Sequence, residues 1–117
     1  MREVENPRIY GVVEFGDKIY GRVHQVVNIV EKPKEPPSNY AVMPIYIFKP
    51  VIMHALREVK PGPKGEIELT DAIGKLVEWG LKVYCILIDR RDVWLDIGTP
   101  ENYWQALKLS YSFNKRR

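Results

Sequence analysis

Short runs of apolar residues, separated by polar positions, predict β-structure in the first part of the chain. Residues 9–15 and 23–30 are rich in β-branched and aromatic side chains, and each run predicts a strand. Residues 16–18, with the sequence Gly-Asp-Lys, lie between them and predict the turn. Residues 40–48 are nearly all apolar, which is typical of a strand buried on both faces of an α/β sheet. Pro44 inside that run predicts a bulge or an edge position, because proline has no amide hydrogen.

The spacing of apolar residues becomes helical after residue 50. Two stripes at helical intervals predict two helices, the first with Ile52, Ala55, Leu56 and Val59 and the second with Leu69, Ala72, Ile73, Leu76 and Val77. Gly80 is placed to end the second helix in the left-handed conformation. Thr99 and Pro100 predict the cap and the first position of a third helix. Residues 82–88 and 93–95 predict two more short strands.

Strands and helices alternate after residue 40, so the pattern predicts an α/β fold. We expect one domain over residues 1–117, because the chain has the length of an ordinary domain and contains no linker, repeat or low-complexity segment. Hydrophobic residues make up 45% of the chain and charged residues 28%, which is the composition of a globular protein. Cys85 is the single cysteine, so no intrachain disulfide forms, and its apolar surroundings predict a core position.

Charge and hydropathy exclude two classes of partner. The formal net charge is +3, and part of it comes from the terminal run 115–117, with no basic face elsewhere. We therefore expect no nucleic-acid partner. The polar residues 1–6 do not resemble a signal peptide, and the longest apolar run, residues 83–88, is too short to span a bilayer. We therefore expect a cytoplasmic protein without a membrane segment.

Three stretches place polar groups beside a glycine or at a strand end. Gly11, after Tyr10, lies within an apolar strand, which marks either a close approach of the backbone to another group or a bulge. Glu31 and Lys32 end the second strand, where they form either a grip for hydroxyls and phosphate or a solvated strand end. Asp96 lies between apolar residues, where a carboxylate needs a metal, hydrogen-bond donors or its own backbone as partner.

The order of these stretches resembles one enzyme family. The chain reads Tyr-Gly-Val-Val-Glu-Phe, Glu-Lys-Pro, Asn-Tyr-Ala-Val, Gly-Glu-Ile-Glu-Leu-Thr-Asp and Trp-Leu-Asp-Ile-Gly-Thr-Pro between residues 10 and 100. Each motif alone is weak, but the five in this order resemble the sugar-1-phosphate nucleotidyltransferases, and glucose-1-phosphate thymidylyl- and uridylyltransferases in particular. The resemblance implies a partial Rossmann-like domain with a mixed sheet and about three helices. It also implies that residues 1–117 correspond to the C-terminal, sugar-binding half of such a domain.

In that family a sugar 1-phosphate attacks the α-phosphate of a nucleoside triphosphate with the help of Mg²⁺. The resemblance implies that Gly11 offers its backbone to the sugar and that Glu31 accepts hydrogen bonds from the ring hydroxyls. It implies that Lys32 contacts the phosphate and that Asp96 binds Mg²⁺. The other implied substrate-binding residues are Tyr10, Val42 and Lys64. Lys64 stands where the family often has an arginine, and it lacks the bidentate fork of that residue. The run 43–44, Met-Pro, stands where the family commonly has a glycine.

One absence limits the expected activity. The family cradles the triphosphate in a glycine-rich loop with a following arginine, and it carries a lysine-proline motif and a second metal-binding aspartate upstream. The 117 residues contain none of these and no Gly-x-Gly run. Backbone donors aimed at the phosphates are a main catalytic device in such sites. We therefore expect no complete catalytic set and no useful transferase activity from this chain alone.

Three readings of the chain follow. In the first, it is a catalytic half that needs a separate N-terminal partner, exposes an apolar surface and forms homo-oligomers or binds that partner. In the second, it is a non-catalytic module that binds a sugar phosphate or a nucleotide sugar and has a regulatory role, which requires Glu31, Lys32 and Asp96 to converge. In the third, it is the remnant of a truncated gene, with a stable fold and no ligand.

Overall fold

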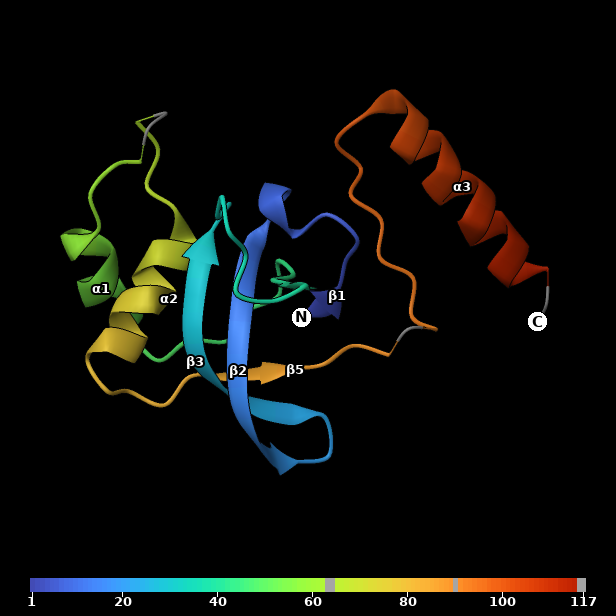
Figure 1. Ribbon diagram of the computed structural model, residues 1–117. Coiled ribbons are helices and arrows are strands. Elements are labelled where there is room, and N and C mark those ends of the chain that lie inside the picture. Colours follow the sequence, from blue (N-terminus) through green and yellow to red (C-terminus); the bar gives the residue numbers. More distant parts are fainter. Residues whose placement is uncertain (63–64, 90, 116–117) are drawn as a thin grey trace.

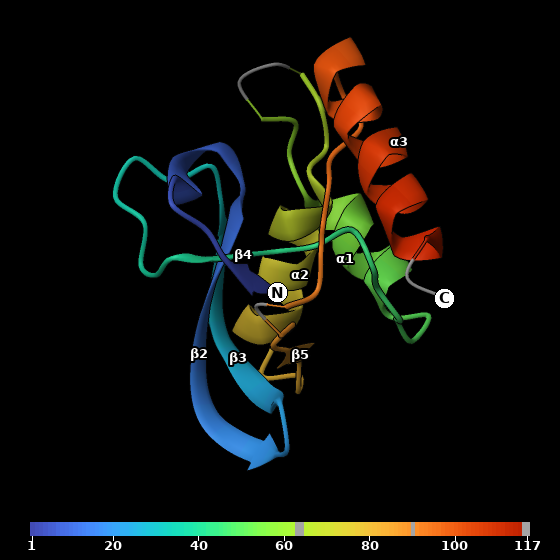
Figure 2. The same ribbon diagram turned by 90° about the vertical axis from the view of Figure 1, so that its right-hand side faces the viewer.

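A computed structural model describes residues 1–62, 65–89 and 91–115. The chain forms a five-stranded sheet with the strand order β1-β4-β2-β3-β5. The strands are β1 (Arg2–Glu3), β2 (Gly11–Tyr20), β3 (Val23–Glu31), β4 (Tyr40–Ala41) and β5 (Tyr84–Ile86). The helices are a 3-10 turn (Pro7–Ile9), α1 (Ile52–Glu58), α2 (Leu69–Glu78) and α3 (Pro100–Asn114). Figures 1 and 2 show α1 and α2 together on one side of the long β2–β3 hairpin.

The structure confirms the predicted α/β fold class and the three predicted α-helices. α1 and α2 form where the apolar stripes predict them, α3 begins at Pro100 as its cap predicts, and Gly80 has the left-handed φ of +73° predicted for the end of α2. The Thr99 hydroxyl accepts a hydrogen bond from the Asn102 backbone N–H at 3.2 Å, as expected of a helix cap. All strand pairings assigned within the described residues are antiparallel.

The β2–β3 hairpin is longer than the sequence predicted. The turn expected at residues 16–18 does not form there, and β2 continues to Tyr20. The chain reverses at Gly21, whose φ of +55° is easily adopted only by a residue without a side chain. The pairing register shifts between Phe15 and Lys18 and again before Tyr20. The glycine and polar residues at 16–18 therefore accommodate irregular pairing within a continuing strand rather than a reversal.

The core lies between the hairpin and the two helices. Val13, Val26 and Ile29 from the strands pack with apolar residues of α1 and α2, namely Ile52, Ala55, Val59, Ala72, Ile73 and Leu76. These are the positions of the predicted helical stripes, so burying them against the sheet is what fixes the two helices in place. Cys85 is half-buried and packs against this core, as expected.

The predicted strand over residues 40–48 forms only in part. β4 ends at Ala41, and Ile47 within the apolar run is 99% exposed. Figure 2 shows the chain after β4 leaving the sheet and crossing toward α1. The prediction of a strand buried on both faces is therefore wrong for these residues in this chain. A sheet strand needs neighbouring strands for its amides and carbonyls, and among the described residues the last such contact is the Val42 N–H to the Gly11 carbonyl.

The segment after β5 differs from expectation in a similar way. β5 covers three residues of the predicted 82–88 run, and residues 93–95 form no strand. α3 contains no buried residue, and Figure 1 shows it set apart from the rest of the chain. Tyr103, Trp104 and Tyr111 on this helix are all exposed. Within the described ranges, no helix is long and apolar enough to cross a membrane.

Candidate functional site

Gly11 and Glu31 are paired residues at the same end of the β2–β3 hairpin. The Lys32 backbone N–H donates to the Tyr10 carbonyl at 3.0 Å. This makes Gly11 and Glu31 a non-hydrogen-bonded pair, the kind in which side chains lie closest. A Cβ on Gly11 would lie 2.8 Å from Glu31 Oε2 and 2.8 Å from Thr70 Oγ1. The missing side chain of Gly11 thus lets a carboxylate and a hydroxyl reach the same point.

Lys32 adds a positive charge to this group of oxygens. Its Nζ lies 3.0 Å from Glu31 Oε1 and 3.6 Å from Glu68 Oε1. The hydrogen bond that Lys32 donates to Glu31 and the negative charge of that carboxylate raise the pKa of Lys32, and Glu68 adds a smaller effect in the same direction. Lys32 also has a φ of +41°, a left-handed conformation that is unfavourable for a residue with a side chain. Such conformations cluster at functional sites, where the surrounding structure holds them.

The first residues of α2 complete the group. Glu68 lies directly before the helix, and its side chain makes no capping hydrogen bond. Thr70 is buried in the first turn, with 6% of its surface exposed. Both residues lie in the Gly-Glu-Ile-Glu-Leu-Thr-Asp motif, but the sequence alone predicted a role for neither of them. A glutamate and a threonine at the start of a helix are common, because such residues also serve to cap helices. Only the packing of α2 against β3 shows that these two belong to the site.

Four aromatic or apolar residues lie near these polar groups. Val42 donates its backbone N–H to the Gly11 carbonyl at 2.8 Å, so this carbonyl is already used within the sheet. The rings of Tyr10 and Trp94 lie 5.6 Å apart between centroids. Burial raises the pKa of Tyr46, and the nearby charge of Glu31 raises it further. The contact with Trp94 brings the start of the Trp-Leu-Asp motif next to the hairpin end.

We name the site cluster by its polar and glycine members: Gly11, Glu31, Lys32, Glu68 and Thr70. Of the residues predicted from the sequence, Tyr10, Gly11, Glu31, Lys32 and Val42 lie at this cluster or in direct contact with it. Lys64 lies outside the described residues. Asp96 is exposed, and no hydrogen bond or ion pair within the described ranges joins it to Glu31 or Lys32.

The described residues do not form a magnesium site by themselves. They contain no group of three or more histidine, cysteine, aspartate or glutamate side chains arranged to hold a metal ion. Asp96 offers one exposed carboxylate, whereas Mg²⁺ requires six oxygen ligands in near-octahedral geometry. A self-sufficient binding module needs Glu31, Lys32 and Asp96 to converge, and in this chain only Glu31 and Lys32 do so.

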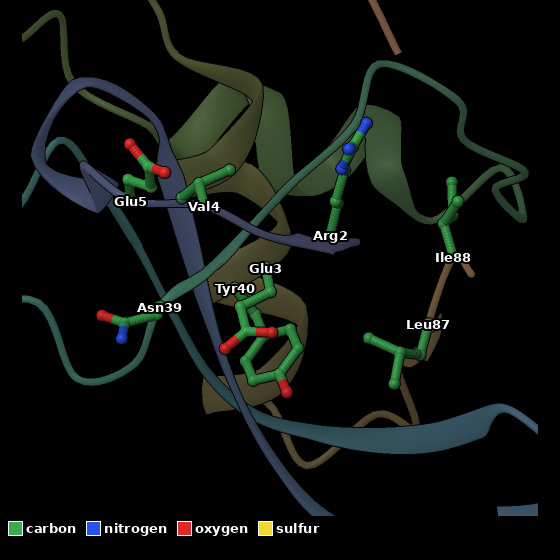
Figure 3. A pocket seen from close by; sticks show the side chains of 8 residues that line it. All are labelled: Arg2, Glu3, Val4, Glu5, Asn39, Tyr40, Leu87 and Ile88. Carbon is green, nitrogen blue, oxygen red and sulfur yellow. The ribbon is translucent and has the colours of Figure 1, made fainter. Parts of the chain in front are cut away.

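A separate hollow lies on the other side of β4. It is lined by Arg2, Glu3, Val4, Glu5, Asn39, Tyr40, Leu87 and Ile88. Figure 3 shows these side chains spread around an open space rather than directed at one point. None of the residues of the site cluster lines this hollow. A ligand there would meet scattered groups, so the hollow is a weaker candidate than the site cluster.

Comparisons with known proteins identify the same family that the order of the motifs resembles. The family described as nucleotidyl transferase matches residues 1–111. The low-salt glycan biosynthesis nucleotidyltransferase Agl11 of Haloferax volcanii is 37% identical over 109 residues, which are 93% of this chain and 29% of the relative. The UTP–glucose-1-phosphate uridylyltransferase AglF of the same organism is 42% identical over 98 residues, 83% of this chain and 37% of the relative.

A solved structure matches as well. UDP-glucose pyrophosphorylase in complex with UDP-glucose superposes with a TM-score of 0.78 and 32% identity, over 99% of this chain and 43% of that chain. This chain therefore spans less than half the length of each relative named here. The matched stretch lies in the N-terminal part of the curated relatives. The expectation that the chain corresponds to a C-terminal half is corrected accordingly.

Proposed function

Because this chain belongs to the nucleotidyl transferase family, we propose that its site cluster binds the sugar of a sugar 1-phosphate or of a nucleotide sugar. The observation that carries the proposal is the meeting of Glu31 Oε2 and Thr70 Oγ1 at the bare Cα of Gly11. A sugar ring presents several hydroxyls on one edge, and these require acceptors and donors at short spacing. A carboxylate, a hydroxyl and an ammonium at one hairpin end provide them.

Glu31 is the main sugar ligand in this proposal. Its side chain is only 17% exposed, and an ionised carboxylate accepts hydrogen bonds from two neighbouring hydroxyls. The ion pair with Lys32 holds the carboxylate in one orientation. Gly11 contributes space rather than a carbonyl acceptor for the sugar, because its carbonyl already accepts the Val42 N–H. Tyr10 and Trp94 form an aromatic wall at the same end of the hairpin.

The phosphate of the substrate needs more positive charge than the described residues provide. Lys32 is one cation between two carboxylates, Glu31 and Glu68, so the three groups have an excess of negative formal charge. A phosphate dianion next to them is repelled unless another cation is present. We propose that Lys64 or a bound Mg²⁺ supplies this charge, with Asp96 as one metal ligand and the substrate phosphates among the others.

We also propose that these 117 residues alone do not catalyse the transfer. Phosphoryl-type transfer depends on positioned donors around the phosphates, and the chain contains no glycine-rich phosphate loop. The relatives' names describe uridylyl- and thymidylyltransferases, and glucose 1-phosphate is the substrate that we transfer from them to this chain.

The test is a coupled pyrophosphate-release assay with glucose 1-phosphate, Mg²⁺ and UTP or dTTP. Full-length AglF serves as the positive control. We expect no turnover from this chain, together with binding of glucose 1-phosphate in a separate titration. Sustained turnover would show that the chain needs no further phosphate-binding residues. Absence of both turnover and sugar binding would favour the remnant.

A further inference from the structure

Residues 45–48 have the side-chain arrangement of a β-strand. The rings of Tyr46 and Phe48 stack with centroids 5.4 Å apart and an interplanar angle of 12°. Residues two positions apart lie on the same side only when the backbone is extended. Tyr46 and Phe48 are each 37% exposed, whereas Ile45 and Ile47 are 78% and 99% exposed. The segment thus has one half-covered aromatic side and one open aliphatic side.

The backbone of this segment has no strand partner. Within the described residues, no amide of residues 46–48 donates a hydrogen bond to another backbone group, and no carbonyl of these residues accepts one. β4, which does pair with β2, ends at Ala41. Unpaired amides and carbonyls on an apolar extended segment are a template for another strand. Four consecutive large apolar residues in this state also leave unfavourable surface in contact with water.

The comparison with the solved pyrophosphorylase indicates what covers the segment. That structure superposes on 99% of this chain, and 57% of its own chain lies outside the match. We propose that residues 45–48 form a sheet strand whose partner is a β-strand from the part of the nucleotidyltransferase fold that these 117 residues do not contain. The unpaired backbone requires a neighbouring strand and the two apolar faces require covering layers, and a position inside an α/β sheet supplies both.

A second copy of this chain fits the segment less well. Pro44 and Pro50 bracket it and have no amide hydrogens, so two copies would pair over a few residues only. Four partly exposed side chains from each copy bury less than the roughly 1,200 Å² at which stable interfaces begin. The proposal rests on family membership and not on sugar binding by the site cluster. Either proposal can be wrong without the other, because strand pairing is measured without a ligand and sugar binding is measured by titration.

The experiment is amide hydrogen exchange of residues 45–48 in two proteins. One is this chain alone, and the other is AglF in which this chain replaces the matched 98 residues. We expect exchange at residues 46–48 to slow by about 100-fold or more in the hybrid, as for amides in a sheet core. A folded hybrid with unchanged exchange would overturn the proposal. Protection in the isolated chain that rises with its concentration would also overturn it, in favour of a second copy.

A measurement in trans covers the case in which the hybrid does not fold. This chain is co-expressed with AglF lacking the matched segment, and the two are purified through a tag on this chain. We expect co-purification, and we expect Ile47→Lys to abolish it while Ile19→Lys, at another exposed isoleucine, does not. Both changes add a charge at a solvent-facing position, so neither removes core packing. Recovery of this chain without the AglF segment, or equal loss from both variants, contradicts the proposed surface.

Discussion

The Glu31 carboxylate occupies the space that a side chain on Gly11 would need. The two residues face each other across the β2–β3 pair, with Glu31 Oε2 2.8 Å from the position of a Gly11 Cβ. Thr70 from α2 reaches the same place. The close packing of β2, β3 and α2 at this point therefore depends on the absence of a side chain at Gly11.

Gly11→Ala is expected to disrupt the site more than the fold. The new Cβ displaces the Glu31 carboxylate, whose side chain is flexible, and presses on Thr70, which is buried. We expect a loss of about 1–3 kcal/mol in the free energy of unfolding, the range for overpacking, and loss of glucose 1-phosphate binding. Urea unfolding and calorimetry measure the two. Gly16→Ala, where a Cβ would meet Val27 at 3.0 Å, is the matched control and should retain binding.

Lys32→Gly separates a functional role of the lysine from a structural one. Glycine adopts the φ of +41° without strain, which offsets its greater loss of backbone entropy. We expect the free energy of unfolding to change by less than about 1 kcal/mol. Binding of glucose 1-phosphate should weaken about tenfold, in line with one lost charge-assisted contact. Lys32→Gln, which keeps a long side chain but not the charge, should weaken it similarly; unchanged binding in both would remove Lys32 from the site.

Tyr46 provides a pH-dependent test of the arrangement around Glu31. Burial and the Glu31 charge both raise the pKa of its phenol above the usual value of about 10. The folded state therefore holds the proton more tightly. This contribution to stability is complete below pH ~10 and is lost as the pH rises through the folded-state pKa. The tyrosinate absorbance difference between the chain and Tyr46→Phe reports that pKa. Glu31→Gln should lower it, and Glu14→Gln, an exposed glutamate on β2, should not.

Magnesium is expected to bind only together with a phosphate ligand. Asp96 is a single exposed carboxylate, and the described residues hold no three-membered cluster of metal-binding side chains. Titration of the chain with Mg²⁺ alone should therefore give no heat above dilution. In the presence of glucose 1-phosphate we expect a signal that Asp96→Asn removes. Tight binding of Mg²⁺ without phosphate would show a metal site that this arrangement does not contain.

The helices were predictable from sequence because their information is local. Apolar spacing defined α1 and α2, and the Thr99 cap and Gly80 marked ends that the structure confirms. The hairpin turn was not predictable in the same way. Both Gly16 and Gly21 suit a reversal, and the choice between them depends on cross-strand pairing of β2 with β3. Residues 45–48 were mispredicted as a buried strand, because a strand also requires partners that the local sequence does not encode.

Part of the site cluster was equally visible from the sequence. Glu31 and Lys32 are neighbours at a strand end, and Gly11 interrupts an apolar strand, so each stood out locally. Thr70 did not, because its closeness to Gly11 arises only when α2 packs against β3. The burial expected for Asp96 from its apolar neighbours is wrong, since its strand-like segment forms no strand and the carboxylate is exposed.

Calorimetric titration of this chain with glucose 1-phosphate, in the presence of Mg²⁺, tests the central claim most directly. We predict binding with a dissociation constant of about 1 mM or lower, lost in Glu31→Gln and in Thr70→Val and retained in Glu14→Gln. Inorganic phosphate should not compete, because the site cluster recognises hydroxyls and carries excess negative charge. No binding at millimolar ligand by a folded chain, or equal binding by all three variants, would contradict a sugar site at Gly11, Glu31 and Thr70.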